Sequence, residues 1–269
     1  MNSGEDWTIT LLATQGVAEF VESSLRGIRG CGIEPAIVHV VLPENATALR
    51  ELVNKLGGTP RILEDLIDAK DVSTTAGYVH YGTPEFNQFM KARFRIIRSL
   101  LNEARQILYA DVDVAWLRNP LPYLSNVLDH FPWACQTEAE PVFPPNFCMG
   151  FFALRNEEHC RKLVEAHIAR FDGNTANATM QRVFNEIVRE DPSLLRSIFP
   201  LPEGLFPNGL LHPLISSEYV GPIDYVIGRV QPFIFHGNFT VGLENKRQLL
   251  RHVHAWWIEA DHIRSEDVT

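Results

Sequence analysis

Short apolar runs and amphipathic stretches alternate along the first part of the chain. Trp7–Ala13 and Ala36–Leu42 are short runs of mostly apolar residues, which are typical of buried parallel strands. Val17–Ile28 and Glu44–Leu56 instead show apolar residues at helical spacing and end next to glycines. An order of strand, helix, strand, helix predicts a parallel sheet joined by right-handed crossovers.

A polar, glycine-bearing stretch follows and leads into a strongly periodic helix. We expect Asp65–Pro84 to form a loop over the functional site, because long loops in compact domains usually serve a function. The apolar residues of Phe86–Ala104 are spaced so that they form one face of a helix. Arg93 lies near the centre of that face. An unpaired cation there is costly, so Arg93 needs a diphosphate or an acid as its partner, unless it snorkels to the helix end.

The rest of the chain predicts further strands and helices, with no internal repeat and no linker. We expect strands at Trp133–Gln136, Phe147–Leu154 and Pro232–Phe235, and helices at Glu157–Phe171, Ala178–Arg189 and Asn245–Ile258. Phe199–Pro202 and Phe206–Gly209 are rich in turn residues and are expected to be irregular. Residues 1–269 are therefore predicted to form a single α/β domain, with a mostly parallel central sheet flanked by helices.

The sharpest signal lies in Ile107–Leu117, where an apolar run leads directly into Asp111 and Asp113. If the strand continues through the acids, both side chains point to the same side, because side chains alternate along a strand. The carboxyl ends of such strands are where open α/β sheets bind ligands, and two crowded carboxylates favour a hard divalent cation. From these two acids alone, a metal anchor and a solvated strand end that caps a turn both stay open.

The composition and the net charge of the chain argue against some classes of function. The 269 residues, 45% of them hydrophobic, suffice for one large globular domain. The chain has 24 Lys and Arg residues against 33 Asp and Glu residues, a net charge of -9. This balance argues against a general nucleic-acid binder, whose phosphate contacts need a basic surface, but it allows a local basic pocket.

The cysteines and the first residues of the chain indicate the cellular compartment in which the protein is expected. Cys31, Cys135, Cys148 and Cys160 form no CxxC pair, which favours reduced thiols over a zinc site or a disulfide framework. The sequence has no apolar run of about 18 residues that would predict a membrane span, and its first residues lack the regions of a signal peptide. We therefore expect a cytoplasmic protein without a transmembrane segment.

Four segments resemble motifs of one enzyme family. Leu108–Pro120 resembles the DxD segment of GT-A nucleotide-diphospho-sugar glycosyltransferases, and especially of glycosyltransferase family 77, which includes plant rhamnogalacturonan xylosyltransferases. Further segments resemble family motifs in the same order: Cys148–Phe152, Leu205–Gly209, and His236–Asn238 with Gly242 and Lys246. The resemblance runs from Thr8 to Trp257 and implies a GT-A, Rossmann-like α/β fold.

The resemblance also implies a metal site. A nucleoside diphosphate is a poor leaving group until its charge is neutralised, and a divalent metal that bridges both phosphates does this. Asp111, Asp113 and His236 are carried over from the family as the metal ligands, although His236 could also be a structural histidine at a strand end. We expect Mn²⁺ before Mg²⁺, because imidazole is a weaker ligand for Mg²⁺.

The expected donor-binding residues come from the end of the first strand, the helix before the DxD segment, and the family motifs. They are Ala13, Thr14, Gln15, Arg93, Asp111, Val112, Gly150, Gly237, Gly242 and Lys246. Lys246 is expected to contact the leaving diphosphate, with a solvated helix-start lysine as the alternative. Arg93 stands where the family usually has Lys, which keeps the charge and adds bidentate phosphate geometry. Gly150 inside a strand indicates a bulge or a close approach by a ligand.

The expected catalytic residues are Asp111, Asp113 and Gln181. The family commonly carries an Asp-Gln pair near the sugar, whereas Met180-Gln181 stands in that place here, which leaves recognition of the donor hydroxyls open. The resemblance implies retention at the anomeric carbon. Without an acid at Met180, a front-face attack is expected rather than a double displacement through a nucleophilic carboxylate.

The function that the resemblance implies is transfer of a sugar of the galactose, xylose or arabinose class from a UDP-sugar to a hydroxyl of a glycan or glycoconjugate. A phosphatase of the haloacid dehalogenase type also has an apolar strand followed by DxD, as in Asp111–Val114, but its downstream acidic pair is absent. A nucleotide-sugar-binding module without turnover stays open because of Met180.

Overall fold

The computed structural model describes residues 7–68, 77–138, 142–173, 179–209 and 231–258. Within these residues a central sheet contains β1 (Trp7–Leu12), β2 (Val38–Leu42), β3 (Thr59–Ile62), β4 (Gln106–Ala110), β6 (Trp133–Thr137), β7 (Phe147–Arg155) and β8 (Ile198–Pro200). Two short strands, β5 (Val114–Trp116) and β9 (Ile234–His236), form a second, small sheet. The helices are α1 (Ala18–Gly30), α2 (Thr47–Lys55), α3 (Leu63–Leu66), α4 (Pro84–Leu100), α5 (Leu121–Leu128), α6 (Glu158–Asp172), α7 (Met180–Glu190), α8 (Pro192–Ser197) and α10 (Leu243–His252).

The strand order of the central sheet is β3-β2-β1-β4-β7-β6-β8. The strands β3, β2, β1 and β4 are parallel neighbours, as the alternation of strands and helices predicts. The strand β7 runs antiparallel to both β4 and β6, and β6 pairs in parallel with β8. The expected mostly parallel α/β sheet of a single domain is confirmed, and the antiparallel β7 brings Gly150 next to the end of β4.

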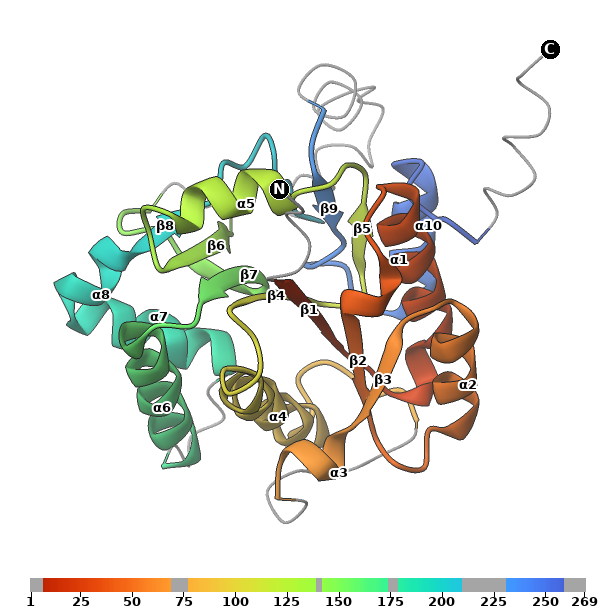
Figure 1. Ribbon diagram of the computed structural model, residues 1–269, viewed down its shortest axis with the longest axis horizontal. Helices are drawn as coiled ribbons and strands as arrows, with labels where there is room; N and C mark the ends of the chain where they lie inside the picture. The colour runs from red at the N-terminus through yellow and green to blue at the C-terminus, as the bar shows by residue number, and fades with distance from the viewer. Residues whose placement is uncertain (1–6, 69–76, 139–141, 174–178, 210–230, 259–269) are drawn as a thin grey trace.

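Helices cover both faces of the sheet (Figure 1). One apolar core lies between the sheet and α3, α4, α6 and α7, and it includes Tyr109. The other lies between the sheet and α1, α2 and α5, and it includes Leu108. Neighbouring residues of β4 enter opposite cores because side chains alternate along a strand. No helix in the described part of the chain combines the length and the apolar character needed to cross a bilayer.

Several elements differ from the sequence-based predictions. β3 and α3 were not predicted, because Thr59–Ile62 is short, contains Pro60 and is only half-buried, so it shows no alternating pattern. The predicted irregular Phe199–Pro202 is wrong in part, since its first residues belong to β8. The predicted helix at Asn245–Ile258 ends earlier, at His252, where the chain turns back. Part of the predicted loop at Asp65–Pro84, residues 69–76, lies outside the described residues.

Candidate functional site

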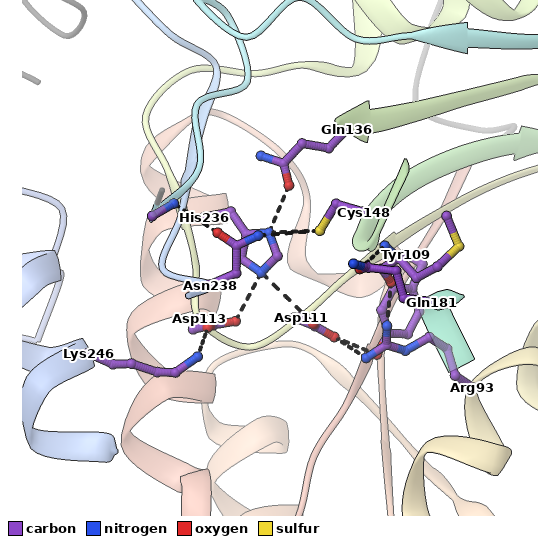
Figure 2. A network of polar contacts seen from close by, with 12 residues as sticks. Arg93, Tyr109, Asp111, Asp113, Gln136, Cys148, Gln181, His236, Asn238 and Lys246 are labelled. Atoms are coloured by element: carbon purple, nitrogen blue, oxygen red, sulfur yellow. Dashed lines mark hydrogen bonds and ion pairs between the residues drawn. The ribbon is translucent and has the colours of Figure 1, made fainter. Parts of the chain in front are cut away.

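The two acids lie in a turn between β4 and β5. The strand β4 ends at Ala110, and the N–H of Val114 donates to the carbonyl of Asp111 at 3.1 Å as β5 begins. The strand therefore does not continue through both acids, because the chain leaves the central sheet there and β5 pairs with β9. The turn nevertheless brings the carboxylates of Asp111 and Asp113 together beside one imidazole (Figure 2).

That imidazole belongs to His236, which reaches the acids because β9 runs beside β5. His236 is paired with Val114 in the register of the small sheet. Its Nε2 lies 3.5 Å from Oδ1 of Asp113 and 3.9 Å from Oδ2 of Asp111. One ligand atom from each of the three residues lies within 4.8 Å of the others. Oxygen and nitrogen ligands at this separation approach the geometry around one divalent ion, whose bonds are about 2.0–2.6 Å long.

A buried glutamine sets the orientation of the His236 ring. Nε2 of Gln136 donates to the carbonyls of Phe206 at 2.9 Å and Pro207 at 3.1 Å, so its Oε1 faces Nδ1 of His236 at 2.8 Å. Nδ1–H is therefore the donor, and Nε2 faces the acids as a buried atom without a hydrogen-bond partner. Metal-bound histidines have this arrangement, with the second ring nitrogen held by an outer partner. The two carboxylates and the imidazole thus fit a divalent metal.

Burial and neighbouring charges shift the pKa values of these groups. Burial alone raises the pKa of Asp113, but Lys246 and His236 outweigh it and hold this pKa well below its ordinary value. Burial alone lowers the pKa of His236, but Cys148 and Asp113 raise it to about 10. A divalent ion therefore competes with a proton for His236, because a histidine ligand must be deprotonated.

Two cations flank the acid pair. Arg93 is only 5% exposed, and its guanidinium donates to Oδ1 of Asp111 at 2.6 Å and to the carbonyl of Met149. Of the two partners expected for this buried arginine, a diphosphate or an acid, the structure shows the acid. On the other side, Nζ of Lys246 pairs with Oδ2 of Asp113. The hydroxyl of Tyr109 also donates to Oδ1 of Asp111, at 2.9 Å.

Gly150 leaves room for the site. A Cβ atom at this position would lie 2.2 Å from Cε1 of His236 and 2.7 Å from Oδ2 of Asp111. These distances are far below van der Waals contact, so any larger residue displaces the two side chains. The close approach predicted from a glycine inside a strand is therefore made by the side chains of His236 and Asp111.

A cavity of about 450 Å³ opens over this group. It is bordered by these predicted site residues: Ala13, Thr14, Arg93, Asp111, Val112, Asp113, Gly150, Gln181, His236, Gly242 and Lys246. Two predicted donor-binding residues do not line it. The side chain of Gln15 accepts from the N–H of Leu49 at 2.8 Å, at the start of α2, and Gly237 donates its N–H to the carbonyl of Asp113 at 2.9 Å.

The structure adds residues that sequence reasoning missed. Gln136 accepts a hydrogen bond from His236, and Tyr109 donates one to Asp111. Glu138 follows β6 and lines the cavity, where it accepts from Nε2 of Gln181. A polar residue at the end of an apolar strand is the signal that could have found Gln136 and Glu138, since strand ends on this side carry the site.

Curated proteins are similar to this chain in sequence. The arabinosyltransferase XEG113 of Arabidopsis thaliana is 27% identical over 194 residues, which are 64% of this chain and 30% of the relative. The UDP-D-xylose:L-fucose alpha-1,3-D-xylosyltransferase 3 of Arabidopsis thaliana is 20% identical over 241 residues, 83% of this chain and 59% of the relative. The chain thus spans less than two thirds of the length of either relative.

Among solved structures, the galactosyltransferase LgtC in complex with donor and acceptor sugar analogs is similar with a TM-score of 0.59 and 11% identity. The match covers 93% of this chain and 95% of LgtC, and it confirms the expected GT-A fold. The family model described as nucleotide-diphospho-sugar transferase matches residues 47–250, which is more than half of the chain. The chain therefore belongs to the nucleotide-diphospho-sugar transferase family.

Proposed function

We propose that this chain is a metal-dependent glycosyltransferase that moves a sugar from a UDP-sugar to a hydroxyl of a glycan or glycoconjugate. The observation that carries the proposal is the group of Asp111, Asp113 and His236, with its buried and unpartnered Nε2, in the wall of the large cavity. Arg93 and Lys246 lie beside it. Cations next to a metal site match the charge that a departing diphosphate develops.

The names of the similar proteins suggest which donors to test. The two relatives are an arabinosyltransferase and a xylosyltransferase that uses UDP-D-xylose, and LgtC is a galactosyltransferase. We therefore propose a UDP-linked xylose, arabinose or galactose as the donor. Ala13 and Thr14, at the end of β1, are the residues that we expect beside the nucleotide, since they line the cavity.

Mn²⁺ is the metal that we propose, with Mg²⁺ as second choice. Two carboxylates suit either ion, but an imidazole ligand favours Mn²⁺. When bound, the ion supplies Lewis-acid neutralisation of the diphosphate. Asp111, Asp113 and His236 would hold it, and Gln136 would keep the His236 ring in the ligating tautomer.

The proposed transfer proceeds with retention. The bond between the anomeric carbon and the diphosphate oxygen breaks, and the acceptor oxygen bonds to the same carbon from the same face. The acceptor proton passes to the departing diphosphate oxygen, so the step needs no carboxylate nucleophile. This route agrees with Met180 in the position where the family has an acid. Arg93 and Lys246 stabilise the leaving charge, and Gln181 steadies the positive charge that develops on the sugar.

The test is turnover with UDP-xylose, UDP-arabinose and UDP-galactose in the presence of Mn²⁺, followed by proton NMR of the product. Transfer that gives a product with the anomeric configuration of its donor is expected. A product with the opposite configuration would require a general base that the proposed step does not contain, and it would overturn retention. Metal-dependent UDP binding without any turnover would instead favour the module without catalysis.

The alternative of a haloacid dehalogenase-type phosphatase is set aside, because the chain belongs to the nucleotide-diphospho-sugar transferase family.

We also propose that the protein works in a reducing compartment such as the cytoplasm. The buried cysteines Cys135, Cys148 and Cys160 form no disulfide, which supports this proposal. Imaging of the tagged full-length protein in its source cells tests it.

A further inference from the structure

A second cavity opens beside the first and shares residues with it. Its volume is about 260 Å³. Glu138, Thr179 and Gln181 line both cavities, and Asn146 and Arg189 line the second alone. A transferase must bring two substrates to one bond, with reacting atoms about 3–3.5 Å apart. Two cavities that meet at shared side chains provide such an arrangement.

The second cavity is polar, and its charges are largely paired. Nε of Arg182 lies 2.8 Å from Oε1 of Glu186, and Arg189 donates to Asn146. Every described residue that lines it has a polar side chain. Its acids disfavour a phosphate, and an apolar molecule would desolvate the charged and amide groups of its lining. Paired charges and amides offer both donors and acceptors, which suits a neutral, hydroxyl-rich saccharide.

One hydrogen-bonded chain connects this cavity to the acids of the metal group. Arg93 links the carboxylate of Asp111 to the carbonyl of Met149. The N–H of Met149 donates to Oε1 of Gln181 at 3.0 Å, and Nε2 of Gln181 donates to Glu138. Figure 2 shows three members of this chain, Asp111, Arg93 and Gln181. The amide of Gln181 is thus held in one orientation, with its nitrogen toward Glu138.

Glu138 places a carboxylate in the large cavity, although Met180 stands where the family motif has an acid. Apart from Asp111 and Asp113, Glu138 is the carboxylate that lines the large cavity among the described residues. It comes from the end of β6 rather than from α7, so no motif in the sequence marks it. A carboxylate at the meeting point of both cavities can accept hydrogen bonds from sugar hydroxyls.

We infer that the second cavity binds the acceptor, a neutral saccharide, and that Glu138 accepts a hydrogen bond from an acceptor hydroxyl next to the attacking one. This inference rests on the proposed glycosyltransferase function. The proton of the attacking hydroxyl still passes to the diphosphate oxygen, so Glu138 orients the acceptor and does not act as a base. Arg189 and Asn146 contact the sugar further from the bond that forms.

The experiment measures binding of methyl glycosides of common neutral sugars to the full chain with UDP and Mg²⁺, by saturation-transfer NMR. UDP affinity is measured by calorimetry in the same samples. We expect at least one neutral methyl glycoside to bind, and Glu138→Ala to weaken its binding about tenfold or more, the effect of losing one charge-assisted hydrogen bond. Arg189→Ala should weaken it as well. UDP affinity should change less than about twofold in both variants, because neither residue touches the metal group.

The matched control is Glu190→Gln, which removes an exposed acid of α7 that pairs with Arg170 outside both cavities. It should leave glycoside binding unchanged. The inference is overturned if a chain that binds UDP with metal binds no neutral glycoside, or if its glycoside affinity is the same in Glu138→Ala and Arg189→Ala. Failure of the parent chain to bind UDP at all would instead count against the proposed function, so the two failures are distinguishable.

Discussion

The Nδ1–H of His236 donates to Oε1 of Gln136 over 2.8 Å, although the two residues lie 100 positions apart. Gln136 is itself held by the carbonyls of Phe206 and Pro207. Three distant segments therefore set one ring nitrogen, Nε2, against the acids. The metal site that we propose depends on this contact as much as on its ligands.

Gln136→Leu should weaken Mn²⁺ binding in the presence of UDP by about 10–100-fold, the usual cost of removing a partner of a metal-bound histidine. The leucine leaves the ring free to turn and to change tautomer. Calorimetric titration of Mn²⁺ measures the effect. Gln106→Leu, which replaces a buried amide of β4 outside the cavity, serves as the control. Equal metal affinity in a folded Gln136→Leu chain would show that the contact is only structural.

Gly150→Ala should abolish most metal-dependent UDP binding. The added Cβ meets Cε1 of His236 at 2.2 Å and Oδ2 of Asp111 at 2.7 Å, so both side chains must move apart. We expect a loss of about 100-fold or more in affinity, measured by the same titration. Gly173→Ala is the control, because its Cβ would be 3.5 Å from the nearest atom, an ordinary contact. A Gly150→Ala chain with normal affinity would contradict the placement of the two ligands.

Gln181→Ala should slow transfer by about one to three orders of magnitude without abolishing it, the range for losing an electrostatic or positioning group. Its amide bridges Met149 and Glu138 and does not carry the reaction itself. Initial rates at saturating donor measure the effect. Complete loss of turnover with intact UDP binding would point to a covalent role that the front-face route excludes.

His167 should make the fold sensitive to acid. It is buried, stacks on Phe94 with ring centroids 3.9 Å apart and contacts the carbonyl of Met180 at 2.9 Å. Burial lowers its pKa from 6.5 to about 4, with the carbonyl of Met180 opposing this shift. Since the folded pKa is the lower one, the stability is fully present above pH 6.5 and is lost as the pH falls toward 4. The loss from this residue amounts to about 3 kcal/mol.

Urea unfolding at several pH values between 6.5 and 4 measures this loss. The variant His167→Phe, which keeps an aromatic ring against Phe94, should show a smaller decrease of the unfolding free energy over that range. The exposed His130→Gln serves as the control and should follow the parent chain. An identical decrease in His167→Phe and the parent chain would assign the acid sensitivity to other groups.

Much of the fold was predictable from local pattern. The long apolar runs of β1, β2, β4 and β7 and the periodic α4 appear where the sequence predicts them, because burial on both faces leaves a clear signal. The half-buried β3 and the short β8 leave none. The acid pair could be identified from the sequence, but the turn that contains it could not. The break after Ala110 depends on the pairing of β5 with the distant β9.

The sequence predicted the site residues that lie in family motifs or at unusual positions of a helix, but not the others. His236 could be joined to Asp111 and Asp113 by family resemblance, whereas local pattern alone reads it as a strand-end histidine. Arg93 was marked by its place on an apolar helical face, which is a physical signal that needs no relative. Glu138 had only a weak signal, its polar place after an apolar strand, because its hydrogen bond with Gln181 and its place between two cavities arise from the folded structure.

The measurement that tests the central claim most directly is calorimetric titration of UDP into the chain and into Asp113→Asn, with and without Mn²⁺ at one concentration. Circular dichroism confirms that the variant is folded, and Asp129→Asn, an exposed acid at the end of α5, is the control. We predict that Mn²⁺ strengthens UDP binding at least about tenfold in the parent chain and the control, and that Asp113→Asn loses this gain. Unchanged metal-dependent affinity in Asp113→Asn would contradict the assignment of the acid pair and the function built on it.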